Sequence, residues 1–167
     1  MDPLSVTLIL KFVTGAIISA LIAWPWILNF LSTKLIPWLR ESVSETIADL
    51  LADVLIFADK GIVLVRRTAK QLWKYLKQNI LGINLKVEKT SATTALGKTT
   101  TFIRDEHGKV IQTVATETLG WEDLPDAIRS EITRQNTSVA EMDLKQPLED
   151  KFKKQAMDQG MELELTN

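Results

Sequence analysis

The sequence predicts a mainly α-helical membrane protein: an N-terminal transmembrane helix, a long amphipathic second helix, and a small cytoplasmic α+β module of a β-hairpin plus a helix. Apolar residues are concentrated at the N-terminus, the middle of the chain has a helical period, and the period changes to two after Gly82. The mean hydropathy of +0.04 is high for a chain with 25% charged residues, and the concentration of apolar residues explains it.

We expect four segments in chain order. They are a transmembrane segment at 1–40, a long amphipathic helix at 41–82, a ββ(β)α module at 83–137, and a charged C-terminal helix or tail at 138–167.

The first segment is the main reason for expecting a membrane protein. Residues 4–31 carry a single charge, Lys11. A continuous helix here would be roughly 40 Å long, enough to cross a bilayer core of about 30 Å. Its Leu, Ile, Val and Phe residues contribute about −6 kcal/mol to insertion, and one lysine near the end costs less than about 3 kcal/mol. We therefore predict a membrane span, with a buried helix of a globular protein as the alternative.

Flanking charges predict the orientation of this span. Cations such as Lys34 and Arg40 follow it, and none precedes it apart from the terminal amine. The positive-inside rule then places the N-terminus outside and the C-terminal domain in the cytoplasm. Small residues suit close packing with another helix and predict a homo-oligomer; they are Gly15, Ala16, Ser19 and Ala23.

A polar stripe runs along the second helix, which we expect from about Ser42 to Asn79. At 100° per residue its members fall within a sector about 40–60° wide on an otherwise apolar surface. The central members are Thr46, Asp49, Asp53, Lys60 and Arg67. The stripe indicates a water-lined path through several copies, a packed oligomerisation helix with a solvated edge, or a helix lying on a surface.

The end of this helix carries basic and aromatic residues that predict contact with anionic lipid headgroups. They are Arg66, Lys70, Trp73, Lys74 and Lys77. An ordinary solvated helix end is the alternative interpretation.

The C-terminal half has strand and turn signals. Residues 100–104 and 109–118 flank the turn sequence Asp105–Gly108, which predicts a hairpin. Residues 90–98 are expected to form a polar loop, and a short helix begins near Asp123 with Pro125 in its first turn. Residues 139–161 predict a weak amphipathic helix or a partly ordered tail.

No catalytic motif is found. The chain has no cysteine and one histidine, His107, which we interpret as an exposed turn residue, and it lacks the phosphate-binding loop, GxSxG and HExxH patterns. We therefore expect no enzyme, cofactor or metal, and the net charge of −1 predicts no nucleic-acid partner.

The leading functional hypothesis is an oligomeric membrane protein that forms or gates a pore, assembled or regulated through its cytoplasmic module. The alternative is a membrane-anchored adaptor or scaffold that recruits a soluble cytoplasmic protein. The expected partners are the lipid bilayer, further copies of the chain and such a soluble protein.

Overall fold

The computed structural model describes residues 16–17, 24–63, 68–134 and 139–163. Its centre is a sheet with the strand order β1-β5-β2-β3-β4. In the series β5-β2-β3-β4 each adjacent pair of strands is antiparallel, whereas the short β1 runs parallel to β5. The strands are β1 (Ala16–Ile17), β2 (Ile80–Lys89), β3 (Thr94–Arg104), β4 (Val110–Gly120) and β5 (Val139–Asp143).

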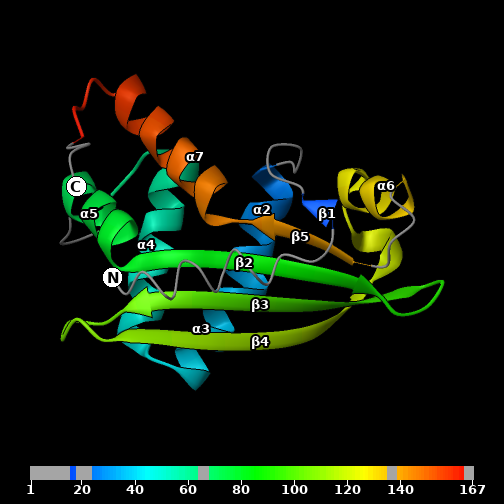
Figure 1. Cartoon of the computed structure of the whole chain (residues 1–167). Coiled ribbons are helices and arrows are strands. Elements are labelled where there is room, and N and C mark those ends of the chain that lie inside the picture. Colours follow the sequence, from blue (N-terminus) through cyan, green and yellow to red (C-terminus); the bar gives the residue numbers. More distant parts are fainter. Residues whose placement is uncertain (1–15, 18–23, 64–67, 135–138, 164–167) are drawn as a thin grey trace.

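Helices cover one face of this sheet. In Figure 1, α2, α3 and α4 lie behind the strands, and α7 rises from the end of β5 toward α5. The helices are α2 (Trp24–Phe30), α3 (Ile36–Ser42), α4 (Glu45–Lys60), α5 (Ala69–Gln78), α6 (Asp126–Arg134) and α7 (Lys145–Asp158). A π-helical turn, η1 (Leu31–Leu35), joins α2 to α3, and a short 3-10 helix, η2 (Trp121–Asp123), precedes α6.

The predicted membrane architecture is contradicted. Among the described residues, no helix has both the length and the apolar character needed to cross a membrane. The observed fold is α+β, so the fold class of a mainly α membrane protein is wrong. The transmembrane helix, the pore or channel, and the orientation with the N-terminus outside are wrong with it.

The physical reason lies in the part of the apolar segment that the structure describes. Ile27, Leu31, Leu35 and Leu39 recur every four residues, and each is at most 2% exposed because it packs in the protein core. Hydropathy measures only removal from water, and a protein core removes an apolar side chain from water as well as lipid does. Residues 1–15 and 18–23 lie outside the described residues.

The long second helix is replaced by two shorter ones. Ser44 caps α4 by accepting a hydrogen bond from the Ile47 N–H at 3.4 Å. Gly61 then ends α4 with a left-handed φ of 71°, and its N–H donates to the Phe57 carbonyl. Helix α5 begins anew at a capping box in which Thr68 and Gln71 exchange hydrogen bonds. Gly82, expected to stop the long helix, lies inside β2.

The hairpin of β3 and β4 turns at Asp105–Gly108, where the sequence predicted it. The Asp105 carboxylate accepts hydrogen bonds from the backbone N–H groups of His107 and Lys109, each at 2.9 Å. These two bonds hold the pKa of Asp105 below its ordinary value, and the bond from Lys109 has the larger effect. Residues 90–98 are only partly a loop, because β3 already begins at Thr94.

One face of the sheet contributes to the core. Leu85 on β2 pairs with Thr99 on β3 and with Met142 on β5, so these three side chains point to the same side. All three are at most 4% exposed. On the helical side of the core, aromatic rings pack against one another. The ring centroids of Phe57 and Phe152 lie 4.3 Å apart, and this contact joins α4 to α7.

The C-terminal region differs from its expected form. Residues 139–143 form β5, which pairs with β2 in the middle of the sheet, and only the following segment is helical. The short helix α6 begins at Asp126, because residues 121–123 form the 3-10 helix η2 instead.

Candidate functional site

The predicted polar stripe lies on the side of α4 that is not fully buried. Thr46 and Lys60 are exposed, and Asp49 and Asp53 are half-buried. The Asp49 carboxylate accepts a hydrogen bond from the Arg40 guanidinium at 2.6 Å, so it is paired within the chain. This arrangement matches a packed helix with a solvated edge. Arg67 lies outside the described residues.

The predicted headgroup cluster is divided between surface and core. Lys70 and Lys74 are exposed on α5, whereas Trp73 is 4% exposed and packs against Phe152, with the ring centroids 5.5 Å apart. Lys77 pairs with Glu149 on α7. The structure therefore uses Trp73 and Lys77 to hold helices together, and Arg66 lies outside the described residues.

Of the four residues predicted for helix packing near the N-terminus, the structure describes one. Ala16 is the first residue of β1 and pairs with Ala140 on β5. The other three, Gly15, Ser19 and Ala23, lie outside the described residues.

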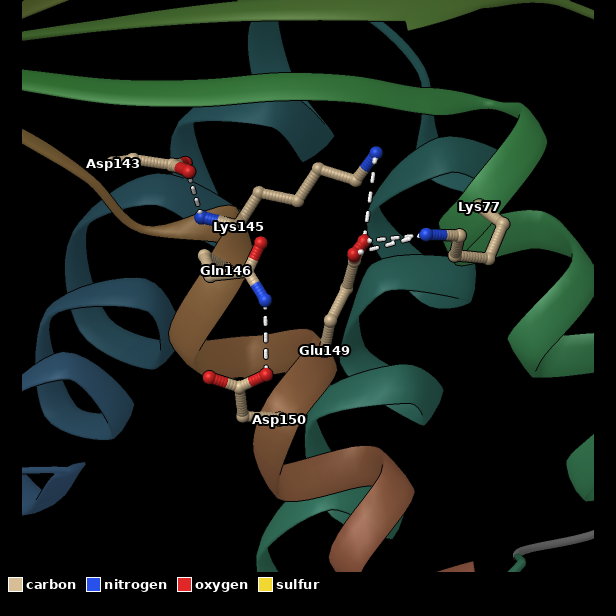
Figure 2. Close-up of polar contacts among 6 residues, drawn as sticks. All are labelled: Lys77, Asp143, Lys145, Gln146, Glu149 and Asp150. Carbon is tan, nitrogen blue, oxygen red and sulfur yellow. Dashed lines mark hydrogen bonds and ion pairs between the residues drawn. The ribbon is translucent and has the colours of Figure 1, made fainter. Parts of the chain in front are cut away.

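Figure 2 shows a cluster of charged side chains where α5, α7 and β5 meet. The Glu149 carboxylate is 9% exposed and accepts hydrogen bonds from Lys77 Nζ at 3.2 and 3.4 Å. Lys145 Nζ lies 3.9 Å from the same carboxylate. Asp143 accepts a hydrogen bond from the Lys145 N–H at 2.9 Å, which satisfies one of the free donors at the start of α7.

This cluster combines the features that first suggest a reactive site. The Lys145 side chain is 16% exposed, and burial lowers the pKa of its ammonium group against the opposing attraction of Glu149. Perturbed groups of this kind occur in active sites and also in structural ion-pair networks. Here the contact of Glu149 with Lys77 joins α7 to α5, so we interpret the cluster as a structural connection that holds α7 in place. Of the residues in this cluster, only Lys77 was among the predicted site residues.

A cavity of about 360 Å³ lies between α4 and the segment formed by α2, η1 and α3. Leu28, Ser32 and Ile36 line one side, and Leu55 and Asp59 are among the residues on the other. The Asp59 carboxylate already accepts a hydrogen bond from the Trp24 indole N–H at 3.1 Å. The cavity is mainly apolar, its charged lining residues are Asp59 and Lys60, and the Asp59 carboxylate is already engaged by Trp24.

Metal chemistry finds no support in the described part of the chain. No group of three or more histidine, aspartate or glutamate side chains there is placed to hold a metal ion. His107 is 82% exposed in the hairpin turn, 3.8 Å from Glu106.

The remaining candidate is the outer edge of the sheet. Strand β4 has 11 residues and pairs with β3 along its whole length. Among the described strands, none pairs with its other side. Every second residue of an edge strand directs its backbone N–H and C=O away from the sheet, so β4 offers a long row of hydrogen-bonding groups.

Proteins usually protect such an edge, and β4 lacks several of the usual devices. Residues 110–120 contain no proline and no lysine. The pairing with β3 continues from Val110 to Gly120 without a bulge. The single charged residue of the strand, Glu117, lies 3.6 Å from Lys34 of η1 and is therefore partly neutralised. At the opposite edge of the described sheet, β1 has only 2 residues, and a short edge strand is itself a form of protection.

Comparisons with known protein families, curated proteins and solved structures give no match.

Proposed function

We propose that this chain is a protein-binding module that accepts an extended strand of another polypeptide along β4. The observation that carries the proposal is the 11-residue edge without proline, lysine or bulge. Binding by strand addition draws its affinity from main-chain hydrogen bonds and its specificity from side chains at alternate positions.

The side chains of β4 support this function on both faces. On the face opposite the helices, Gln112, Val114, Thr116 and Thr118 alternate along the strand and are exposed. Threonine and valine favour strand pairing because their branched side chains pack well on a pleated surface. A strand added at this edge would lie beside the uncharged side chains that β4 presents on this face.

Two side-chain contacts tie β4 to the rest of the fold. Thr101 on β3 and Thr113 on β4 join their hydroxyl groups in a hydrogen bond on the covered face. Glu117 ties the same strand to η1 through Lys34. An edge held in place before binding loses less conformational entropy when a partner strand is added.

The experiment measures amide hydrogen exchange in β4 of the full chain, with and without a peptide. The peptide has the length of β4, alternates threonine with valine, and ends in lysines for solubility. We expect it to slow exchange in β4 and to leave β2, which is paired on both sides, unchanged.

Two lysine substitutions provide the matched test. Val114→Lys places a hydrated charge on the edge strand, where it also repels the peptide lysines, and should abolish most of the protection. Leu96→Lys places the same charge on the same face of β3, one strand from the edge, and should leave the protection intact. Unchanged exchange in β4 at saturating peptide, measured at a chain concentration where sedimentation shows a monomer, would contradict the proposed function.

A further inference from the structure

We infer that the strand accepted by β4 is β4 of a second copy of this chain, so that two sheets join into one around a two-fold axis. This inference rests on the proposed function and names the partner for the same edge. It follows from the number of long edges, the side-chain pattern of β4, and the position of its one charge.

Within the described residues the sheet has one long edge, which determines the kind of assembly. When β4 of one copy pairs with β4 of another, the contact is isologous: both copies contribute the same surface. That surface is then no longer available to a third copy. Because the other edge of the described sheet is the 2-residue β1, such a pair offers no equally long edge for further growth. The expected product is a closed dimer and not a fibre.

The side-chain pattern of β4 is compatible with antiparallel self-pairing centred on Ala115, the middle residue of the strand. In this register Ile111 lies opposite Leu119 of the partner subunit on the helix-covered face. Both side chains are half-buried in the single chain, so their contact removes further apolar surface from water.

The charge pattern agrees with the same register. Glu117 lies opposite Thr113 of the partner subunit, so the two carboxylates do not face one another. Within its own chain Glu117 stays beside Lys34 at 3.6 Å. On the open face, Val114 lies opposite Thr116 of the partner subunit, and both side chains are exposed in the single chain. No like-charge pair opposes the association.

Disulfide formation tests the axis directly, because the natural chain has no cysteine. Ala115→Cys brings two thiols onto the two-fold axis, where directly opposite Cβ atoms are close enough for a disulfide after a small shift. We expect a cross-linked dimer of the full chain under mild oxidation, with twice the 18.8 kDa mass of one chain. Leu96→Cys, one strand away, should give several-fold less cross-linking.

Charge substitutions test the register independently. Val114→Lys should shift the full chain from dimer to monomer in sedimentation equilibrium. Adding Thr116→Glu to the same chain should restore the dimer, because each lysine then faces a glutamate of the partner subunit. Thr116→Glu should not restore association if the strands pair in another register.

The results of these experiments distinguish a failure of the two-fold dimer from a failure of strand binding at β4. A monomeric full chain with no cross-linking at Ala115→Cys would overturn the two-fold dimer. If the threonine–valine peptide still protected β4 in that case, the binding edge would stand with a different partner strand. If the peptide also failed, both would be wrong.

Discussion

Lys77 and Glu149 are 72 positions apart in the chain, yet Lys77 Nζ lies 3.2 Å from a carboxylate oxygen of Glu149. The contact joins the last turn of α5 to the first half of α7. Glu149 is almost fully buried, whereas the Lys77 side chain is 38% exposed. The lysine therefore compensates a buried charge while its own ammonium group keeps part of its hydration.

Removal of Lys77 should destabilise the fold. Lys77→Met leaves Glu149 with Lys145 at 3.9 Å as its remaining cation. We expect a loss of about 1–2 kcal/mol in the free energy of unfolding, because hydrogen bonds to charged groups contribute about 1.5–3 kcal/mol and Lys77 is partly solvated. Urea unfolding of the full chain measures this loss.

A double-mutant cycle separates the pair from other effects of the substitutions. Glu149→Gln in the Lys77→Met background should cost less than it does in the natural chain, because the ion pair has already been removed. Lys74→Met, an exposed position one turn earlier on α5, should change stability by less than about 0.5 kcal/mol. Strict additivity of the two substitutions would show that the contact contributes nothing.

The buried position of Lys145 predicts a pH dependence. Because burial lowers its pKa, the unfolded chain holds more protons than the folded chain between that lowered pKa and the ordinary 10.5. Stability therefore rises with pH across this window, and it is lost as the pH falls through the folded-state value. Lys77, Asp143 and Glu149 surround the group and contribute to the same balance.

Lys145→Met isolates this contribution. The difference in unfolding free energy, natural chain minus variant, should increase as the pH rises from 7 toward 10.5. Urea unfolding at several pH values provides the measurement. A difference that stays flat, or that falls with pH, would show that burial does not penalise the charged form of Lys145.

Local features of the fold could be predicted from the sequence, and long-range ones could not. The Ser44 cap and the turn at Asp105–Gly108 depend on neighbouring residues, so their signals are present in a short window. β5 was missed because its 5 residues become a strand by pairing with β2, more than fifty positions earlier. The packing of Leu31 and Leu35 in a core was missed because an apolar run does not say what will cover it.

The same distinction applies to the candidate site. The hairpin containing β4 was predicted from its turn and its alternation, but an edge strand differs from a central one only in what lies beside it. Its composition did hold one readable signal, the absence of proline and lysine from 11 residues. The Glu149 cluster had no such signal, since its lysines also suit a solvated helix end.

Two glycines with left-handed backbones should respond differently to alanine. Gly61 has a φ of 71° and Gly108 a φ of 82°, so Gly61→Ala and Gly108→Ala each force an L-residue into a conformation that costs about 1–2 kcal/mol. A Cβ at Gly108 meets nothing within 4 Å. One at Gly61 lies 2.6 Å from Gln159 Nε2 and 2.7 Å from Gln155 Oε1.

The difference between the stability losses of Gly61→Ala and Gly108→Ala measures the packing of α7 on the end of α4. Gln155 Nε2 donates a hydrogen bond to the Asp59 carbonyl at 3.0 Å, and Gln159 Nε2 donates to the Gly61 carbonyl. Gly61→Ala should displace these side chains and cost about 1 kcal/mol more than Gly108→Ala in thermal or urea unfolding. Equal losses would indicate that both glutamines move aside freely.

Glu141 predicts a second pH effect, of opposite sign to that of Lys145. It lies on β5 directly opposite Lys86 of β2 and is 5% exposed. Burial raises the pKa of its carboxyl group, and the attraction of Lys86 opposes this rise only in part. The folded chain therefore holds more protons than the unfolded chain between the ordinary 4.5 and the raised pKa, and stability falls as the pH rises through that window.

Glu141→Gln replaces the carboxyl group with a neutral side chain of the same shape, and it should stabilise the fold at pH 7. The gain should disappear below pH 4.5, where the natural carboxyl group is itself protonated in both states. Glu88→Gln, at an exposed position on β2, should change stability by less than about 0.5 kcal/mol and serves as the matched control. If Glu141→Gln instead destabilised the fold at pH 7, attraction to Lys86 would outweigh the cost of burying the charge.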